Sequence, residues 1–255
     1  NMALQKHLEQ SLDQTKASLG AAEALCAIVE TKTGNIIALS TSNRYNPEKI
    51  TQSDVPNIKL NAIQYVFEPG SIIKPLILGL LFEKNRVNPY HILPGHNGKF
   101  TIADKTITDE HPFSHLSVEE TIIHSSNIGM AQLGQLLSGD EIYSGLRLLG
   151  FSEKSGVDLP FEYHGTTPTV RELETPIYKA TISYGYGLQA NFTQILKSYN
   201  ALANNGENIL LRLSDGVVKA DGTFVPHPPT KSTPMFKATT AYKLQEFLKK
   251  VVTEG

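Results

Sequence analysis

The sequence has little of what would cross-link, anchor or export a protein. Its 255 residues contain no tryptophan and one cysteine, Cys26, so no disulfide can form within the chain. Cys26 falls in the apolar run 24–29, which predicts a small buried hydrophobe rather than a catalytic thiol. The longest apolar stretch, 76–82, is far shorter than the roughly 20 residues of a membrane helix, and no charged-then-apolar leader opens the sequence. We therefore expect neither a membrane span nor an export signal in this chain.

The sequence also lacks an excess of either charge. Lys plus Arg number 23 and Asp plus Glu number 25, a net charge of -2, which does not favour a nucleic acid partner. The eight histidines form no convincing metal set: His111 and His115 are four residues apart, but Pro112 between them disfavours the helix that would align them. The sequence has no glycine loop of the phosphate-binding type. We expect a small ligand, with no metal and no cofactor.

What the sequence does contain is an irregular Pro-Gly corner within 67–75 that leads directly into an apolar helix. The proline and glycine end the preceding segment, and apolar residues then recur at helical spacing from 72 to 81. This pattern predicts a helix that begins at or beside Ser71. Pro75 is compatible with such a helix because the first backbone N–H groups of a helix have no partner within it.

Ser71 and Lys74 form the candidate catalytic pair. A lysine at i+3 lies on the same helix face as the serine hydroxyl, close enough to take its proton if burial lowers the lysine pKa. The unpaired N–H groups at a helix start would also stabilise a developing oxyanion. A Ser-x-x-Lys sequence is expected about once by chance in a chain of this length, so the evidence is its placement after Pro-Gly at the start of an apolar helix.

A second polar cluster, Ser125-Ser126-Asn127, lies between two short helical patterns. Residues 117–120 match a capping box, which starts a helical region that runs from 117 to about 150. Two hydroxyls and an amide at a helix junction either point into a cleft or cap the second helix. Another Ser-x-Asn, at 198–200, lies in the middle of a helical pattern and is interpreted as structural.

The rest of the sequence predicts short strand pairs between amphipathic helices. Leucines near the N-terminus predict a helix that packs on a sheet, and apolar positions from 241 to 251 predict a last helix. Lys32-Thr33-Gly34 falls in a hairpin turn and is interpreted as structural. Residues 41–66 lack periodicity and predict a long connection. Strand pairs are expected at 24–30 with 35–40, at 99–103 with 105–108, and at 210–218 with 222–225.

Taken in order, these segments resemble the class B penicillin-binding proteins, the monofunctional D,D-transpeptidases that cross-link peptidoglycan. Ser71-x-x-Lys74 is similar to the family's nucleophile motif, and Ser125-x-Asn127 is similar to its second motif. The form Gly185-Tyr186-Gly187 resembles the septal, division-type branch. The segments that carry the similarity are 29–38, 67–75, 117–129, 183–188 and 251–255, so it extends over nearly the whole chain.

The resemblance implies a fold and a set of roles. The fold is α/β, in which an antiparallel sheet that includes the 24–40 hairpin is flanked by helices on both faces, with a helical subdomain at 75–150. The catalytic residues are Ser71 as the acylated nucleophile, Lys74 as its base and Ser125 as a proton relay, and Asn127 binds the substrate backbone. The implied ligands are peptidoglycan stem peptides and β-lactam antibiotics.

The resemblance also implies a setting at the outer, periplasmic face of the bacterial cytoplasmic membrane, with an anchor that is not in this chain. The implied partners are proteins of the division or elongation complexes, including a glycosyltransferase. Members of the family carry a K-T-G or K-S-G strand shortly after a segment similar to 251–255. We therefore expect 1–255 to be a transpeptidase domain truncated before that strand, with its C-terminal strands missing.

Two other functions stay open at this point. A serine β-lactamase or β-lactam sensor shares Ser-x-x-Lys, although Ser125-x-Asn127 differs from the S-x-V of class D enzymes and no E-x-x-L-N segment supplies the class A glutamate. A catalytically inactive binding module of the division complex would keep the fold without turnover. The lifetime of the acyl-enzyme separates a β-lactamase from a transpeptidase.

Overall fold

A helix that is buried on all sides carries one of the candidate residues. In the computed structural model, which describes residues 2–255, this helix is α3 (Lys74–Glu83), and every residue in it except the last is buried. A 3-10 turn, η2 (Gly70–Ile73), precedes it, and Pro75 lies in its first turn. The predicted helix start beside Ser71 is therefore confirmed. Because α3 is apolar all round, it packs as a core element.

Other helices surround α3 and share its hydrophobic core. Helices α5, α6 and α10 contact it directly. The predicted helical region 117–150 is confirmed as α4 to α6, and the predicted last helix is confirmed as α10. The helices that follow α3 are α4 (Val118–Ile123), α5 (Asn127–Gly134), α6 (Gly139–Leu148), α7 (Val170–Leu173), α8 (Pro176–Ser183), α9 (Phe192–Ala203) and α10 (Ala238–Glu254). The stretch 75–150 also contains four short strands, and its status as a subdomain stays a prediction.

The strands form antiparallel pairs, and the three expected pairs are confirmed, with strand ends that differ from the expected ones in most cases. The pairs are β1 (Leu25–Val29) with β2 (Ile36–Thr41), β3 (Val66–Phe67) with β8 (Ala190–Asn191), β4 (Ile92–Pro94) with β7 (His115–Ser117), β5 (Lys99–Ile102) with β6 (Lys105–Thr108), β9 (Glu207–Asn208) with β12 (Thr233–Pro234), and β10 (Gly216–Val218) with β11 (Phe224–Pro226). The long connection 41–66 contains a 3-10 turn, η1 (Gln52–Asn57), and a short helix, α2 (Asn61–Gln64); a further turn, η3 (His96–Gly98), precedes β5. Residues 32–34 lie in the β1–β2 turn, as predicted.

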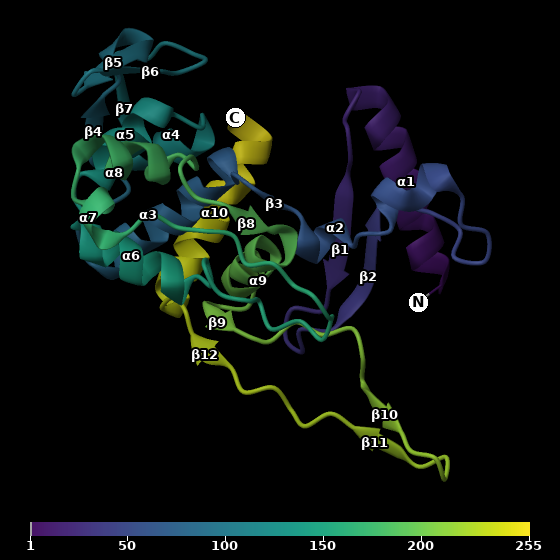
Figure 1. Cartoon of the computed structure of the whole chain (residues 1–255). Coiled ribbons are helices and arrows are strands. Elements are labelled where there is room, and N and C mark those ends of the chain that lie inside the picture. Colours follow the sequence, from purple (N-terminus) through teal and green to yellow (C-terminus); the bar gives the residue numbers. More distant parts are fainter. Residues whose placement is uncertain (1) are drawn as a thin grey trace.

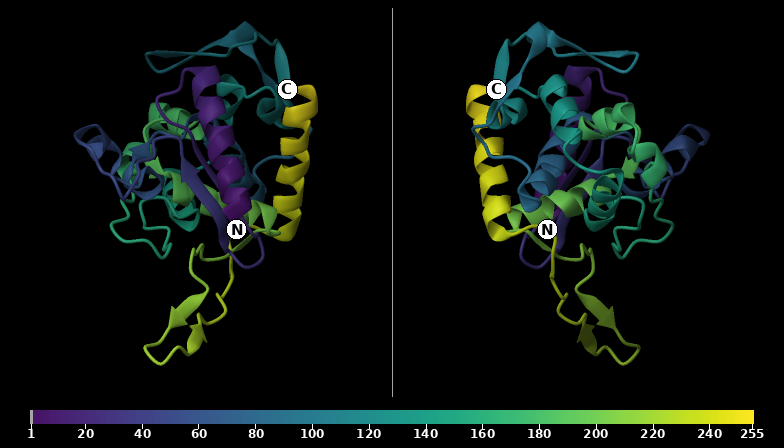
Figure 2. Two further views of the ribbon diagram at one scale, coloured as in Figure 1. Left: turned by 90° about the vertical axis from the view of Figure 1, so that its right-hand side faces the viewer. Right: turned by 90° about the vertical axis from the view of Figure 1, so that its left-hand side faces the viewer.

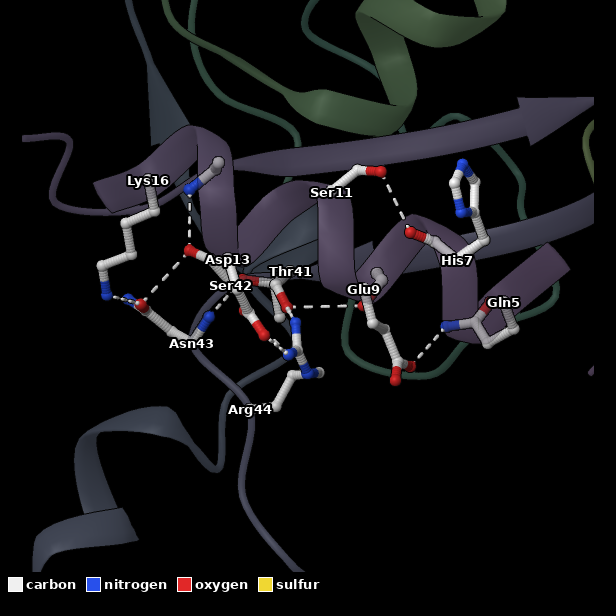
Figure 3. Close-up of polar contacts among 12 residues, drawn as sticks. Gln5, His7, Glu9, Ser11, Asp13, Lys16, Thr41, Ser42, Asn43 and Arg44 are labelled. Atoms are coloured by element: carbon white, nitrogen blue, oxygen red, sulfur yellow. Dashed lines mark hydrogen bonds and ion pairs between the residues drawn. The ribbon is translucent and has the colours of Figure 1, made fainter. Parts of the chain in front are cut away.

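The N-terminal helix α1 (Met2–Leu19) packs on the β1–β2 hairpin, as expected from its leucines. Leu8 and Leu12 are buried against Ala38 of β2. Figure 3 shows polar contacts within α1 and between α1 and the residues at the end of β2, among them the bonds from Arg44 Nη2 to both carboxylate oxygens of Asp13 at 2.8 and 2.6 Å. The expected stripe ends early, because Leu19 is exposed at the end of the helix.

The elements are arranged as a helical part and a hairpin part with an extension. Figure 1 shows α3 to α8 and α10 on one side and α1 with β1 and β2 on the other. The β10–β11 hairpin projects away from both parts, and the two views in Figure 2 agree on this. The architecture is therefore α/β with helices around small antiparallel sheets, as predicted. The β5–β6 hairpin lies at the outer end of the helical part, beside α4 and α5.

The packing of α10 against α3 gives a direct test of this core. Leu244 of α10 is fully buried and lies against Gly79 of α3, whereas Val252 of the same helix is 86% exposed. We expect Leu244→Ala to lower the free energy of unfolding by about 2–5 kcal/mol, because it removes buried methyl groups and leaves a cavity. Val252→Ala should change it by no more than about 0.5 kcal/mol. Urea denaturation of the two variants measures both, and equal effects would contradict this packing.

Candidate active site

Lys74 is a buried lysine whose amine is held by a single residue. The side chain is 2% exposed, and its Nζ donates to the Ser125 carbonyl oxygen at 2.5 Å and contacts the Ser125 Oγ at 3.0 Å. An uncompensated ammonium in such a place is costly, so burial favours the neutral amine. The structure thus brings together two of the four residues that the sequence singled out.

The end of α4 explains why both oxygens of Ser125 face the lysine. Ser125 N–H donates to Ile122 O at 3.1 Å and Ser126 N–H donates to Thr121 O at 2.9 Å, which is the Schellman arrangement at a helix C-terminus. This arrangement needs a left-handed residue, and Ser125 has φ +52. Glycine usually takes that position, since a side chain is strained there. A serine in its place delivers a hydroxyl to the site.

The next helix, α5, begins immediately after this turn and has its free N–H groups satisfied. Ser126 is the N-cap and its Oγ accepts from Gly129 N–H at 2.8 Å. The carboxylate of Asp109 accepts from Asn127 N–H at 2.6 Å and from Ile128 N–H at 3.0 Å, and its other oxygen accepts from the Ser126 hydroxyl at 2.5 Å. The first three N–H groups of α5 are therefore all bonded. Asp109 directly follows β6, and sequence reasoning missed it because no motif or spacing marks it.

Ser71 lies one turn before Lys74 and faces solvent. Its side chain is exposed, and its hydroxyl makes no hydrogen bond to any of residues 2–255. The hydrogen bond in this turn is a backbone one, from Lys74 N–H to Ser71 O. The backbone thus places Ser71 and Lys74 one turn apart, as expected. The Ser71 hydroxyl, however, makes no hydrogen bond to the Lys74 amine.

The Pro-Gly corner that carries Ser71 is fastened to the loop at 184–188. Gly70 N–H donates to Gly185 O at 3.0 Å, and Gly187 N–H donates to the Glu68 carboxylate at 2.8 Å. A Cβ on Gly185 would lie 1.9 Å from Gly70 O, and its φ is +98, so no other residue fits there without moving the corner. The Gly-Tyr-Gly loop, which the sequence left open as either a pocket wall or a plain turn, is a direct support of the Ser71 corner.

A tyrosine from α9 adds a third support. Tyr199 OH donates to Ile72 O at 2.8 Å, and burial raises the pKa of this phenol to about 12, so it stays a donor at physiological pH. Sequence reasoning placed Tyr199 inside the structural Ser-x-Asn at 198–200 and gave it no role. Its two neighbours bond elsewhere: Ser198 Oγ donates to Leu149 O at 2.7 Å and Asn200 Nδ2 donates to Thr31 O at 3.2 Å.

Asn127 is the first residue of α5 and lies two residues after Ser125. Its Nδ2 donates to Thr108 O at 3.2 Å, which uses one of its two side-chain N–H bonds. The side chain is partly exposed. The structure therefore leaves an amide donor on the turn that contacts Lys74, but its role stays a prediction at this point.

The electrostatics of the site are dominated by the burial of Lys74. Desolvation lowers the pKa of the amine from its ordinary 10.5 to about 8, and the negative charge of Asp109 partly opposes this shift. About a tenth of the amine is therefore neutral at pH 7 and about half of it at pH 8. That is the range in which an amine works both as a proton acceptor and, once protonated, as a donor.

Among residues 2–255, no group of three or more His, Cys, Asp and Glu side chains is placed to hold a metal ion. None of the helices in the same range has the length and apolar character needed to cross a membrane. A cavity of about 350 Å³ lies at the base of the β10–β11 hairpin, lined in part by Asp158, Arg212 and His227. None of its lining residues belongs to the candidate site.

The left-handed turn at Ser125 predicts an unusual order of stabilities. Ser125→Gly relieves the backbone strain, whereas Ser125→Ala keeps the Cβ and removes only the hydroxyl. We expect the glycine variant to have a free energy of unfolding about 1 kcal/mol above that of the alanine variant. Chemical denaturation compares the two. An alanine variant as stable as the glycine variant would show that the turn is not strained.

The buried lysine predicts a stability that rises with pH. The amine gives up its proton near pH 8 when folded and near 10.5 when unfolded, so the penalty is fully present below pH 8 and is lost as pH rises toward 10.5. At pH 7 we expect Lys74→Met to raise the free energy of unfolding by about 1–3 kcal/mol, with a smaller gain at pH 10.

Urea denaturation of Lys74→Met at the two pH values tests this expectation. Lys84→Met, an exposed lysine at the end of the same helix, is the control and should change stability by less than about 0.5 kcal/mol. A gain for Lys74→Met that is the same at pH 7 and pH 10 would contradict the lowered pKa.

Comparison with known proteins places this geometry in a family. Residues 24–255 match the penicillin binding protein transpeptidase domain. The chain is 28% identical over 251 residues to the probable peptidoglycan D,D-transpeptidase PenA of Neisseria flavescens, covering 97% of this chain and 58% of that protein. It is 26% identical over 252 residues to penicillin-binding protein PbpB of Mycobacterium tuberculosis, covering 98% of this chain and 37% of that protein.

A solved structure agrees with the sequence comparisons. Penicillin binding protein 3 of Mycobacterium tuberculosis, complexed with aztreonam, superposes on 100% of this chain and 57% of that chain, with a TM-score of 0.90 and 25% identity. The chain thus spans 58% and 37% of the two curated relatives. The resemblance to class B penicillin-binding proteins is confirmed. The chain belongs to the penicillin binding protein transpeptidase domain family.

Proposed function

We propose that this chain is the catalytic domain of a peptidoglycan D,D-transpeptidase that works through a serine acyl-enzyme. The observation that carries the proposal is the buried Lys74 amine, held by both oxygens of Ser125 and one turn from Ser71. A serine hydroxyl needs an adjacent base to become a nucleophile, and a lysine with a lowered pKa is such a base. The name of the Neisseria relative, a probable peptidoglycan D,D-transpeptidase, supports the substrate class.

The first half-reaction cleaves the terminal D-alanyl-D-alanine bond of a stem peptide. Ser71 Oγ attacks the carbonyl carbon and its proton passes to the neutral Lys74 amine. The proton then passes through Ser125 Oγ to the nitrogen of the departing D-alanine. Gly70 N–H is already bonded to Gly185 O, so the next backbone N–H of η2, that of Ser71, is the proposed donor to the developing oxyanion. The remaining N–H of Asn127 Nδ2 donates to the substrate backbone.

The second half-reaction transfers the acyl group to an amine of a neighbouring stem peptide. That amine attacks the ester carbonyl and gives its proton to Lys74, and Ser71 regains a proton as the ester bond breaks. One lysine therefore accepts and returns a proton twice in each cycle. A β-lactam acylates the same serine, but its opened ring does not leave as the D-alanine does.

The biological setting belongs to the same proposal. Cross-linking of peptidoglycan places the domain at the outer face of the bacterial cytoplasmic membrane, where the partners would be division or elongation complex proteins, including a glycosyltransferase. The similarity to a protein named peptidoglycan D,D-transpeptidase FtsI, 25% identical over 199 residues, supports the septal branch. Two alternatives can be told apart from this proposal. A β-lactamase differs from a transpeptidase in the lifetime of its acyl-enzyme, and an inactive binding module differs in that it is not acylated.

We expect a covalent penicillin adduct at Ser71. Acylation should be lost in Ser71→Ala and slowed by a factor on the order of 10² in Lys74→Ala, because the hydroxyl then lacks its base. In the unsubstituted chain the rate should be half-maximal near pH 8 and fall roughly tenfold per pH unit below it, as the amine becomes protonated. Fluorescent penicillin labelling, intact mass and peptide mapping measure these quantities.

The lifetime of the adduct distinguishes the proposed function from its alternatives. A transpeptidase holds the penicilloyl ester, whereas a β-lactamase hydrolyses it quickly. A rapidly cleared adduct would therefore favour the β-lactamase, and failure to form an adduct even in a chain that includes the family's K-T-G strand would favour the binding module. An adduct that survives Ser71→Ala would overturn the assignment of the nucleophile.

A further inference from the structure

Among residues 2–255, Asp109 is the acidic side chain whose carboxylate hydrogen-bonds to the turn at 125–127. It directly follows β6, and its carboxylate takes three hydrogen bonds, from Asn127 N–H, Ile128 N–H and the Ser126 hydroxyl, at 2.5 to 3.0 Å. Bonds to a carboxylate are about twice as strong as neutral ones, and a negative charge is favourable at a helix N-terminus. Three such bonds on three consecutive residues fix the start of α5.

We infer that Asp109 is a positioning residue of the active site, which holds the Ser125 hydroxyl and carbonyl against the Lys74 amine by closing the N-terminus of α5. The inference rests on the proposed function and names a residue outside the motifs from which that function was recognised. Asp109 acts through other residues: its hydrogen bonds reach the backbone on the C-terminal side of Ser125 and not Lys74 itself.

The turn that holds Ser125 is fixed from two sides. On one side, the Schellman bonds to Thr121 and Ile122 tie it to α4. On the other side, Asp109 ties Ser126 and the first residues of α5 to the β5–β6 hairpin. Without the second tie, the left-handed conformation at Ser125 relaxes, and both contacts with the amine depend on that conformation.

Asp109 is itself placed rigidly. Its N–H donates to Gly98 O at 3.2 Å, and the preceding carbonyl, Thr108 O, accepts from Asn127 Nδ2. Ile107 of β6 is buried against Ile128 of α5. The carboxylate therefore sits on a short strand that packs on the helix it caps, so its position is set by packing as well as by hydrogen bonds.

Asp109 also acts on Lys74 through its charge. Its carboxylate stabilises the protonated amine and so raises the lysine pKa against the effect of burial. The 3-10 turn η2 and helix α5, both packed on α3, carry no charged residue. Most charged groups on the other elements around α3 have partners of their own: Glu141 with Arg86, Arg147 with Glu153, Lys250 with Glu119, Glu246 with Lys249, and Lys243 over the ring of Phe82. The other two, Asp140 of α6 and Glu254 of α10, are exposed to solvent.

These two effects have different signatures when the charge is removed. Loosening the turn lowers the maximal acylation rate, whereas losing the negative charge lowers the Lys74 pKa and moves the acid side of the pH profile to lower pH. A residue that only stabilised the fold would change neither at a pH and temperature where the variant is folded. The pH profile is therefore the deciding measurement.

The chain supplies a matched control in Asp158. Its carboxylate accepts from Leu213 N–H at 2.7 Å, from Ser214 N–H at 2.9 Å and from the Ser214 hydroxyl at 2.5 Å. This is the same set of donors as at Asp109, two consecutive backbone N–H groups and a serine hydroxyl. It lies on the cavity at the base of the β10–β11 hairpin and contacts none of the candidate site residues.

The experiment compares Asp109→Asn, Asp109→Glu and Asp158→Asn in the full chain, with acylation by fluorescent penicillin followed from pH 6 to 10. We expect Asp109→Asn to lower the maximal rate by about 10²-fold, the usual effect of displacing a catalytic group by about 1 Å, and to move the acid limb to lower pH. Asp109→Glu keeps the negative charge but moves the carboxylate. The maximal acylation rate should therefore fall, while the acid limb of the pH profile stays at the same pH. Asp158→Asn should leave both unchanged.

A second readout does not depend on acylation. NMR titration of the Lys74 side chain should give a lower pKa in Asp109→Asn than in Asp158→Asn, and amide exchange at Asn127 and Ile128 should be faster only in the Asp109 variants. If Asp109→Asn matches Asp158→Asn in all these measurements, the positioning role is wrong even where Ser71 is acylated. If a chain that includes the family's K-T-G strand is not acylated either, the proposed function fails, and the titration and exchange still decide the role of Asp109.

Discussion

The interaction on which the site depends is the burial of the Lys74 amine with only Ser125 as its partner. Among residues 2–255 no carboxylate forms a hydrogen bond or ion pair with the nitrogen, and the charge of Asp109 only partly offsets the cost of burying a positive charge there. The amine therefore becomes a base in the range of pH 8. The same burial destabilises the fold below that pH. The apolar surroundings that lower the Lys74 pKa therefore also lower the stability of the fold, because an uncharged side chain such as methionine at position 74 would not carry the cost of a buried charge.

The site is built where two helices meet rather than on either helix alone. Helix α4 is followed by the left-handed residue Ser125, and α5 starts two residues after it, so backbone geometry directs the Ser125 carbonyl and the short Ser125 side chain toward the amine. Glycine would satisfy that geometry with less strain. The serine is tolerated because the bonds to Thr121, Ile122 and Asp109 over-determine the turn around it.

Local rules in the sequence predicted much of this arrangement. The Pro-Gly corner, the apolar run after it and the capping box at 117–120 each follow from short-range physics, and the structure has a helix start at each. Contacts between segments that are far apart in the sequence could not be predicted in this way. Asp109 meets α5 only through the packing of β6, and Gly185 meets Gly70 from a separate loop, so neither carries a local signal.

The short 3-10 turn explains how residues three apart in sequence have opposite exposures. In this geometry the side chains at i and i+3 lie one above the other, since each turn takes three residues. Ser71 and Lys74 span one such turn, with the backbone bond from Lys74 N–H to Ser71 O closing it. The Ser71 hydroxyl therefore faces solvent, and the Lys74 amine lies in the core. In the proposed reaction, the substrate reaches Ser71 from the solvent side and the proton moves inward to the buried Lys74 amine.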